Sequence, residues 1–193
     1  MAQDAASRLF VSVPRTRLMR LFLFSPKVQF SVLDIVSRTH FTSNEIRREV
    51  KLLREAGIIR ISRSKKTRCS LNERYPYILE LRHVLLDAVL SKRSLLERLR
   101  RTGVVRFLAV SGIFIGDFDR RLDVIIVGDR ISDMRLRSAI RTLEKDIGTE
   151  LRFASLPTQD FLYRLTISDR FLRNFLDYPH HTVLDRLGIE LTP

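Results

Sequence analysis

Residues 41–72, FTSNEIRREVKLLREAGIIRISRSKKTRCSLN, carry the pattern that decides the fold of the first part of this 193-residue chain. Thr42 and Glu45 have the spacing of a capping box, in which the Thr42 side chain caps a helix and Glu45 reaches back to it. Gly57 is a good residue to end that helix. The stretch therefore predicts a helix over residues 43–56.

The predicted helix is amphipathic. Its apolar residues recur at helical spacing and are Ile46, Val50 and Leu53. Its opposite face carries one amide and four basic side chains, which are Asn44, Arg47, Arg48, Lys51 and Arg54. Shorter helices are predicted over 15–24 and 32–40, separated by a break at 25–28. Two short helices joined by a tight turn, with a basic outer face on the second, are typical of a helix-turn-helix.

Residues 58–72 predict a basic β-hairpin directly after this helix. Ile59 and Ile61 alternate with polar residues as in a strand, residues 64–66 provide a turn, and residues 67–71 return. A basic hairpin in this place is a wing, whose Lys and Arg side chains neutralise phosphates while the helix reaches base edges in the major groove. The predicted DNA-binding residues are Ser43, Asn44, Arg47, Arg48, Lys51, Arg63, Lys65, Lys66 and Arg68.

The net charge of +13 is unevenly distributed along the chain. Residues 1–103 carry 22 Lys+Arg and 9 Asp+Glu, whereas residues 104–193 carry 13 of each. A basic first half favours a polyanionic partner, and with the predicted wing it favours double-stranded DNA. The alternative is a solvated basic surface, which explains solubility but not the neutrality of the second half.

Residues 14–82, which begin PRTRLMRLFLF, resemble the winged-helix domain of a prokaryotic transcriptional-regulator family. In that family the domain is fused to a nucleotidyltransferase-like domain. The residues that carry the resemblance are Arg17, Leu21, Asn44, Arg47, Arg48, Leu52, Leu53, Ala56, Gly57, Arg63 and Arg68. The resemblance extends over nearly the whole chain. It implies an α+β protein with a winged helix-turn-helix in 1–74, a connecting or dimerisation helix in 75–103 and a nucleotidyltransferase-like domain in 104–193.

The segment 75–103 predicts one long helix or two helices in succession. Its apolar residues at helical intervals include Ile78, Leu81, Leu85, Val89 and Leu96. Two interpretations stay open. The helix packs on its own domains, or it pairs two chains into a homodimer, as helices flanking the DNA-binding module commonly do in winged-helix regulators.

The second half predicts alternating strands and helices. Strands are predicted over 104–110, 122–128 and 150–156, helices over 132–148 and 158–178, and a short extended piece over 181–185. Met134, Leu136, Ile140 and Leu143 are predicted to form the apolar face of the first of these helices. This alternation is typical of an α/β or α+β sheet domain.

The nucleotidyltransferases that this half resembles hold two magnesium ions with three carboxylates on neighbouring strands. Here Asp123 matches one carboxylate, and Arg121 or Ile125 stands where its partner is expected. Because residues two apart in a strand share a face, Arg121 is predicted to pair with Asp123. The strand 150–156 places no carboxylate toward the site. We therefore expect no catalytic residue, no metal site and no cofactor.

A small-molecule or protein partner of the second domain remains possible at the glycine-bearing turn and the start of the next strand. The candidate residues for this pocket are Ser111, Gly112, Gly116 and Asp123. Ser111-Gly112 stands where the family has Gly-Ser, with the order reversed.

The predicted function is a sequence-specific, DNA-binding transcriptional regulator whose second domain is non-catalytic. One alternative is an active, metal-dependent nucleotidyltransferase localised by a winged helix, and another is an adaptor that binds protein rather than DNA. No apolar run reaches the ~20 residues that cross a membrane. The first residues do not read as a signal peptide and Cys69 is the single cysteine, so we expect a cytoplasmic protein.

Overall fold

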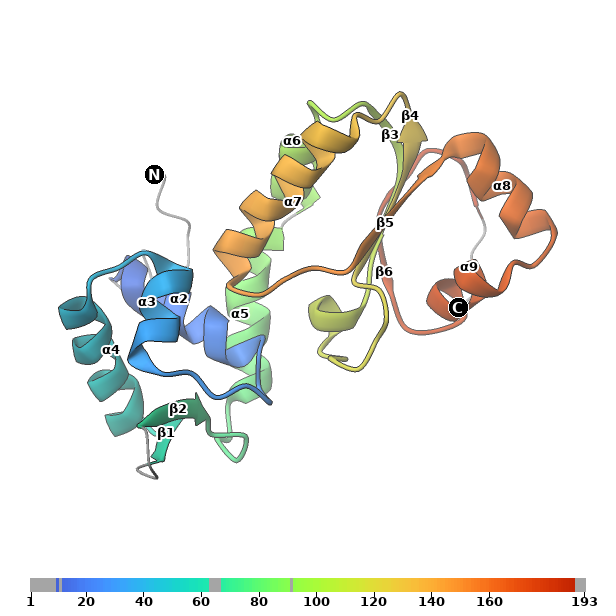
Figure 1. Cartoon of the computed structure of the whole chain (residues 1–193). Helices are drawn as coiled ribbons and strands as arrows, with labels where there is room; N and C mark the ends of the chain where they lie inside the picture. The colour runs from blue at the N-terminus through green and yellow to red at the C-terminus, as the bar shows by residue number, and fades with distance from the viewer. Residues whose placement is uncertain (1–9, 11, 63–66, 91, 190–193) are drawn as a thin grey trace. The chain divides into compact units, whose positions relative to one another are not determined.

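The computed structural model describes residues 10, 12–62, 67–90 and 92–189 (Figure 1). The chain divides into two compact units, one formed by residues 1–89 and 143–149 and the other by 90–142 and 150–193. Each unit contains helices and a small antiparallel or mixed sheet, so the predicted α+β class is confirmed. In the described ranges no helix is both long and apolar enough to cross a membrane.

The division into units changes how the charge is shared. By sequence count, the first unit has 18 Lys+Arg and 10 Asp+Glu, and the second has 17 and 12. The basic excess is therefore +8 and +5, and is not confined to one unit. The main reason is that residues 90–103, which carry five Lys+Arg and one Glu, belong to the second unit rather than to the first.

The first unit consists of helices, a two-stranded antiparallel sheet and one more helix. In chain order these are α2 (Val13–Leu23), α3 (Val32–Thr39), α4 (Ser43–Glu55), β1 (Ile59–Ser62), β2 (Arg68–Leu71) and α5 (Ile78–Leu90). Local sequence determines where α3 begins. Ser31 and Asp34 form a capping box, in which the Ser31 side chain accepts from the Asp34 N–H and the Asp34 side chain accepts from the Ser31 N–H.

The core of the first unit lies between α2, α4 and the hairpin. Leu18, Leu21 and Phe22 of α2 are buried against Ile46 and the other apolar residues of α4. Phe30, in the loop between α2 and α3, exchanges backbone hydrogen bonds of 2.8 and 2.7 Å with Cys69 of β2. The loop thus adds a short third strand-like contact to the hairpin and holds it on the core.

A buried carboxylate fixes α4 on α2. Glu49 accepts hydrogen bonds from the Ser12 hydroxyl at 2.9 Å and from Arg15 Nε at 2.8 Å. Because Glu49 is on the same side of α4 as Ile46 and Val50, these bonds orient the opposite side of the helix outward.

The second unit is built on a four-stranded sheet. Its elements are α6 (Lys92–Leu99), β3 (Val104–Val110), the 3₁₀ helix η1 (Gly112–Ile115), β4 (Val124–Asp129), α7 (Asp133–Ile147), β5 (Phe153–Pro157), α8 (Thr158–Thr166), α9 (Arg170–Leu176) and β6 (His181–Asp185). The last residues of α7, from Leu143 on, belong to the first unit. The strand order is β5-β4-β3-β6. β3 is antiparallel to both β4 and β6, and β4 is parallel to β5.

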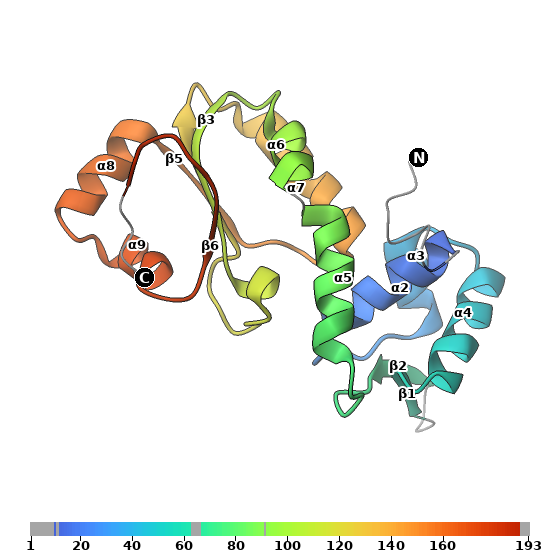
Figure 2. The same ribbon diagram turned by 180° about the vertical axis from the view of Figure 1, so that it is seen from behind.

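Helices lie on both faces of this sheet. α6 and α7 lie on one side and α8 and α9 on the other, as the two opposite views show (Figures 1 and 2). On the α8–α9 side, Phe107 of β3 stacks on Phe161 of α8 with ring centroids 5.2 Å apart. Ile125 and Val127 of β4 belong to the same buried cluster. Near-continuous apolar strands, such as 124–127, result from this two-sided burial.

Two predictions of local structure need correction, and one open alternative is decided. The segment 158–178 is two helices, because the Asp169 side chain accepts from the N–H groups of Phe171 and Leu172 and caps α9. Met134 is 79% exposed and is not part of the apolar face of α7. Of the two forms predicted for 75–103, the structure has two helices, α5 and α6.

Candidate nucleic-acid interface and the Asp123 site

The start of α4 is defined by the predicted capping box. The Glu45 N–H donates to the Thr42 hydroxyl at 3.3 Å, and the Thr42 N–H and hydroxyl donate to Glu45 Oε2 at 2.8 and 2.7 Å. The Thr42 hydroxyl and then its N–H hold the pKa of Glu45 below the ordinary value, because both stabilise the charged carboxylate. The prediction of a helix cap at Thr42 is confirmed.

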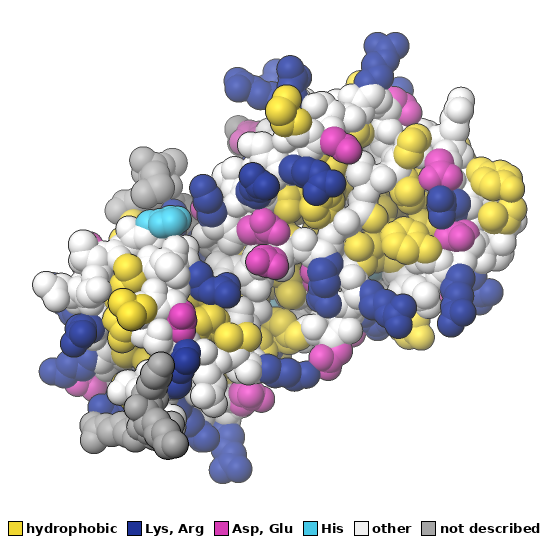
Figure 3. Space-filling view, viewed as in Figure 1, with side chains coloured by type: hydrophobic (Ala, Val, Ile, Leu, Met, Phe, Trp, Pro, Cys, Tyr) yellow, Lys and Arg dark blue, Asp and Glu magenta, His cyan; other side chains and the backbone are white. Residues whose placement is uncertain are grey.

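The outer side of α4 is basic and exposed. The residues predicted there, all exposed, are Ser43, Asn44, Arg47, Arg48, Lys51 and Arg54. Lys51 lies 3.9 Å from Glu55 in a solvent-exposed pair, which contributes little. Arg47, Arg48 and Arg54 make no ion pair with any residue that the structure describes. Dark blue Lys and Arg side chains are seen along this edge of the first unit in Figure 3.

The hairpin contributes less than predicted within the described residues. β1 and β2 pair antiparallel from Ile59–Leu71 to Ser62–Arg68, as predicted. Arg60 of β1 is exposed. The predicted contacts Arg63, Lys65 and Lys66 lie outside the described residues.

Arg68 has a partner within the protein. Its Nη1 lies 2.9 Å from Asp34 Oδ2, so that it ties β2 to α3. Hydrogen bonds from the Ser31 backbone and side chain, together with the charge of Arg68, hold the pKa of Asp34 below its ordinary value. The Arg68 guanidinium is therefore already engaged in an ion pair within the first unit.

Asp123 is a completely buried carboxylate with four hydrogen bonds. Its Oδ1 accepts from the Ile113 N–H at 3.1 Å and from Arg152 Nη2 at 3.0 Å. Its Oδ2 accepts from the Arg152 N–H at 2.8 Å and from Arg152 Nε at 3.0 Å. The bond with Asp123 raises the pKa of the Arg152 guanidinium further above its ordinary value. Both oxygens of Asp123 are therefore engaged with protein donors.

The predicted pairing of Asp123 with Arg121 is wrong. Arg121 is exposed, and Arg152 takes the position beside the carboxylate. β4 begins only at Val124, so the strand alternation that would place residues 121 and 123 on one face does not apply. Arg152 reaches Asp123 because Val124 pairs with Phe153 across the parallel β4–β5 ladder.

The predicted pocket residues serve mainly to pack this site. Gly112 has φ +56°, and a Cβ there would collide with Asp123 Oδ1. Ser111 is buried and its hydroxyl donates to the Pro179 carbonyl at 3.0 Å. Gly116 ends η1 in an exposed, left-handed conformation. The structure thus does not bring Ser111, Gly112, Gly116 and Asp123 together around an open cavity.

Ser111 does line one hollow, of about 760 Å³. Most of its lining comes from the loop before β4 and from α9: Asp119, Arg120, Arg121, Leu122, Arg170, Phe171, Asn174, Phe175 and Tyr178. The Arg120 guanidinium lies 4.0 Å from the Tyr178 ring centroid and its Nε lies 2.7 Å from Asp117. This hollow was not predicted, because α9 brings its aromatic residues there from far along the chain.

Among the described residues no group of three His, Cys, Asp or Glu side chains is placed to hold a metal ion. Comparisons with models of protein families, with curated proteins and with solved structures gave no match for the chain.

Proposed function

We propose that this protein binds double-stranded DNA with its first unit, which we interpret as a winged helix, and acts as a transcriptional regulator. The observation that carries the proposal is the outer side of α4. There Arg47, Arg48 and Arg54 are exposed and make no ion pair with the described residues. An unpaired row of guanidinium groups on one helix is suited to a polyanion.

The architecture around α4 supports this interpretation. α3 and α4 are separated by the three residues 40–42, with His40 in a left-handed conformation. Such a short turn between two helices is typical of a helix-turn-helix. The capping box at Thr42 and the bonds of Glu49 hold α4 in place, so the basic side is presented on a rigid element.

The roles of the α4 residues follow from their position along the helix. In a helix-turn-helix, residues near the N-terminal end of the recognition helix reach base edges. We assign Asn44 and Arg47 to base edges, since amides pair with adenine and guanidinium groups with guanine. We assign Arg48, Lys51 and the exposed Arg60 of β1 to phosphates, which position the protein without reading sequence.

We further propose that the second unit has no nucleotidyl-transfer activity and binds a ligand or a partner instead. Two-metal transfer requires several carboxylates with oxygens directed at the cations. Asp123 is the carboxylate that matches the family pattern, and both of its oxygens accept hydrogen bonds from Ile113 or Arg152. Its arrangement is that of a structural ion pair.

The experiment is to select duplexes that the protein prefers from a random library and to measure affinities by fluorescence anisotropy. Arg47→Ala should cost about 1–3 kcal/mol on the preferred duplex and should relax the preference at the position that Arg47 reads. The matched control is Arg74→Ala, which removes another exposed guanidinium, outside α4. An Arg47→Ala variant that binds and discriminates as the control does would overturn the proposal.

A further inference from the structure

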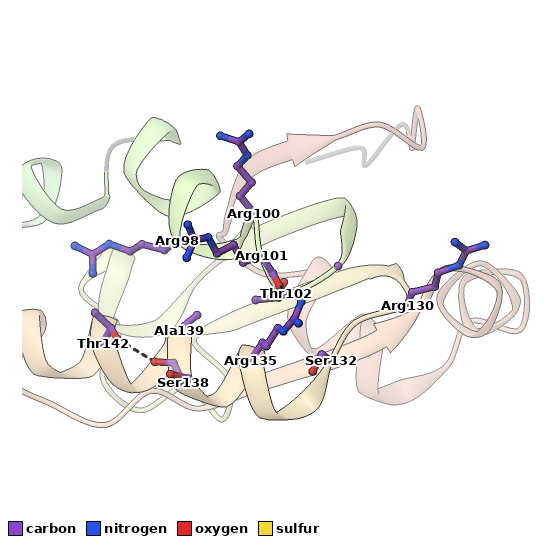
Figure 4. A pocket seen from close by; sticks show the side chains of 11 residues that line it. Arg98, Arg100, Arg101, Thr102, Arg130, Ser132, Arg135, Ser138, Ala139 and Thr142 are labelled. Atoms are coloured by element: carbon purple, nitrogen blue, oxygen red, sulfur yellow. Dashed lines mark hydrogen bonds between the residues drawn. The ribbon is translucent and has the colours of Figure 1, made fainter.

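A hollow of about 790 Å³ in the second unit is lined by five arginine side chains. It lies between the end of α6, the turn before β3, the loop after β4 and one side of α7 (Figure 4). Its lining residues are Arg98, Arg100, Arg101, Thr102, Gly103, Arg130, Ser132, Arg135, Ser138, Ala139 and Thr142. We call it the arginine hollow.

The charge of the arginine hollow is not balanced from within. No carboxylate is among its lining residues. Arg100, Arg101 and Arg130 make no ion pair with any residue that the structure describes, and Arg135 Nη1 donates only to the Arg101 carbonyl, at 3.4 Å. Arg98 Nε donates to the Ser94 hydroxyl at 3.4 Å. The other four guanidinium groups around the hollow repel each other, and a bound polyanion would relieve that repulsion.

The hollow owes its shape to short side chains on α7. Ser138, Ala139 and Thr142 follow Arg135 at helical spacing, so a groove without bulky groups runs along this side of the helix. The Thr142 hydroxyl donates to the Ser138 carbonyl at 3.0 Å (Figure 4). Figure 4 shows Arg101 and Arg135 in the middle of the hollow, with Arg98, Arg100 and Arg130 extending outward around them.

The backbone that forms one wall of the hollow is held in place by hydrogen bonds and by a close contact within the protein. The Ser132 N–H donates to the Thr102 carbonyl at 2.7 Å, and the buried Thr102 hydroxyl donates to the Leu99 carbonyl at 2.7 Å. A Cβ on Gly103 would lie 2.6 Å from the Arg130 carbonyl oxygen, so these two backbones are in direct contact. Arg130 itself is left-handed, with φ +54°, which is unusual for a residue other than glycine.

The lining residues indicate the chemistry of the ligand. No aromatic or large apolar side chain lines the hollow, so it provides no apolar wall for a hydrophobic group. The groups present are guanidinium groups and hydroxyls, which bind phosphate oxygens. The hollow begins at the N-terminal end of the 15-residue helix α7, whose dipole adds to the positive potential.

We infer that the arginine hollow is a binding site for a compact polyphosphate group. Its volume falls in the range of about 300–1,000 Å³ that is usual for ligand sites. The exposed side chains of Arg100 and Arg130 turn inward when the anion binds, and Arg101 and Arg135 hold it from the middle. This inference does not rest on the proposed DNA binding, since none of the residues belongs to the first unit.

The test is isothermal titration calorimetry of the full chain with inorganic tripolyphosphate at a fixed salt concentration. The wild type should bind one tripolyphosphate, and the Arg101→Ala/Arg135→Ala double variant should bind at least ten times more weakly. The matched control is Arg137→Ala/Arg141→Ala, which removes two exposed guanidinium groups of α7 that do not line the hollow. Its affinity should stay within twofold of the wild type.

Arg100→Ala provides a second variant, because this exposed side chain has no partner among the described residues and its loss leaves the fold intact. It should weaken tripolyphosphate binding severalfold. Absence of binding by the wild type, or equal weakening in the hollow and control double variants, would overturn the inference. The backbone of duplex DNA also carries phosphates, and the same variants distinguish it from a free polyphosphate. If the wild type does not bind tripolyphosphate and the Arg101→Ala/Arg135→Ala variant binds duplex DNA more weakly than the wild type, this surface is a DNA contact. That result would also overturn the inference.

Discussion

Replacing Arg152 by alanine removes a guanidinium from a carboxylate that has no contact with solvent. Asp123 is 0% exposed, and two of its four hydrogen bonds come from the Arg152 side chain. The other two come from the N–H groups of Ile113 and of residue 152 itself, and both remain in the variant. The perturbation therefore leaves a buried charge with half of its donors.

The expected magnitude follows from these bonds and from the exposure of the partner. A hydrogen bond to a charged group contributes about 1.5–3 kcal/mol, so two of them set an upper limit of about 3–6 kcal/mol. The Arg152 side chain is 43% exposed, so water and salt already weaken its ion pair with Asp123. In the variant, water can also enter the space that the Arg152 side chain leaves. We therefore expect the free energy of unfolding of the second unit to fall by about 2–3 kcal/mol, between the values for exposed and buried pairs.

The assay is urea unfolding followed by circular dichroism, with hydrogen exchange of peptides around residue 113 to report on the second unit alone. Arg121→Ala is the matched control, because Arg121 is exposed and makes no hydrogen bond with Asp123. Its effect should stay within about 0.5 kcal/mol. Equal stability of the two variants, or a larger loss for Arg121→Ala, would refute the assignment of Arg152 as the partner of Asp123.

Three further predictions concern packing, pH and assembly. Gly112→Ala should lower the melting temperature more than Gly116→Ala: both glycines have positive φ, but a Cβ at 112 strikes Asp123 while one at 116 meets nothing within 4 Å. The lowered pKa of Glu45 contributes stability that is present above its unfolded pKa and lost as the pH falls through its folded pKa. Thermal melts should therefore show a weaker loss of stability below about pH 4 in Glu45→Gln than in the wild type. Light scattering at micromolar concentration should give the mass of a homodimer. A monomeric mass, measured both for the free protein and for the protein bound to DNA, would contradict that prediction.

Features that depend on local sequence could be predicted. The start of α4 at Thr42 and its end before Gly57 are signalled by residues within one turn of each boundary. The exposed basic side of α4 follows from helical spacing alone. The strand predicted over 104–110 and the short extended piece predicted over 181–185 agree with β3 and β6 residue for residue, since turn-forming or polar residues lie on either side of each.

Features that depend on contacts between distant segments could not be predicted in the same way. Arg152 becomes the partner of Asp123 only through the parallel pairing of β4 and β5, which nothing near residue 123 indicates. The arginine hollow forms because the β3–β4 pairing brings the turn 100–103 next to Arg130 and the start of α7. The break between α8 and α9 is different, because it is local: Asp169 caps α9, and the prediction missed it since the apolar residues on both sides have the spacing of one continuous helix.

The proposed DNA binding through α4 can be tested by the salt dependence of the affinity for a preferred duplex. The logarithm of the association constant should fall linearly with the logarithm of the salt concentration, with a slope of about −0.9 for each phosphate neutralised. Lys51→Ala should make that slope shallower by about one unit while leaving the sequence preference unchanged. An affinity that stays constant from low to physiological salt would contradict the account.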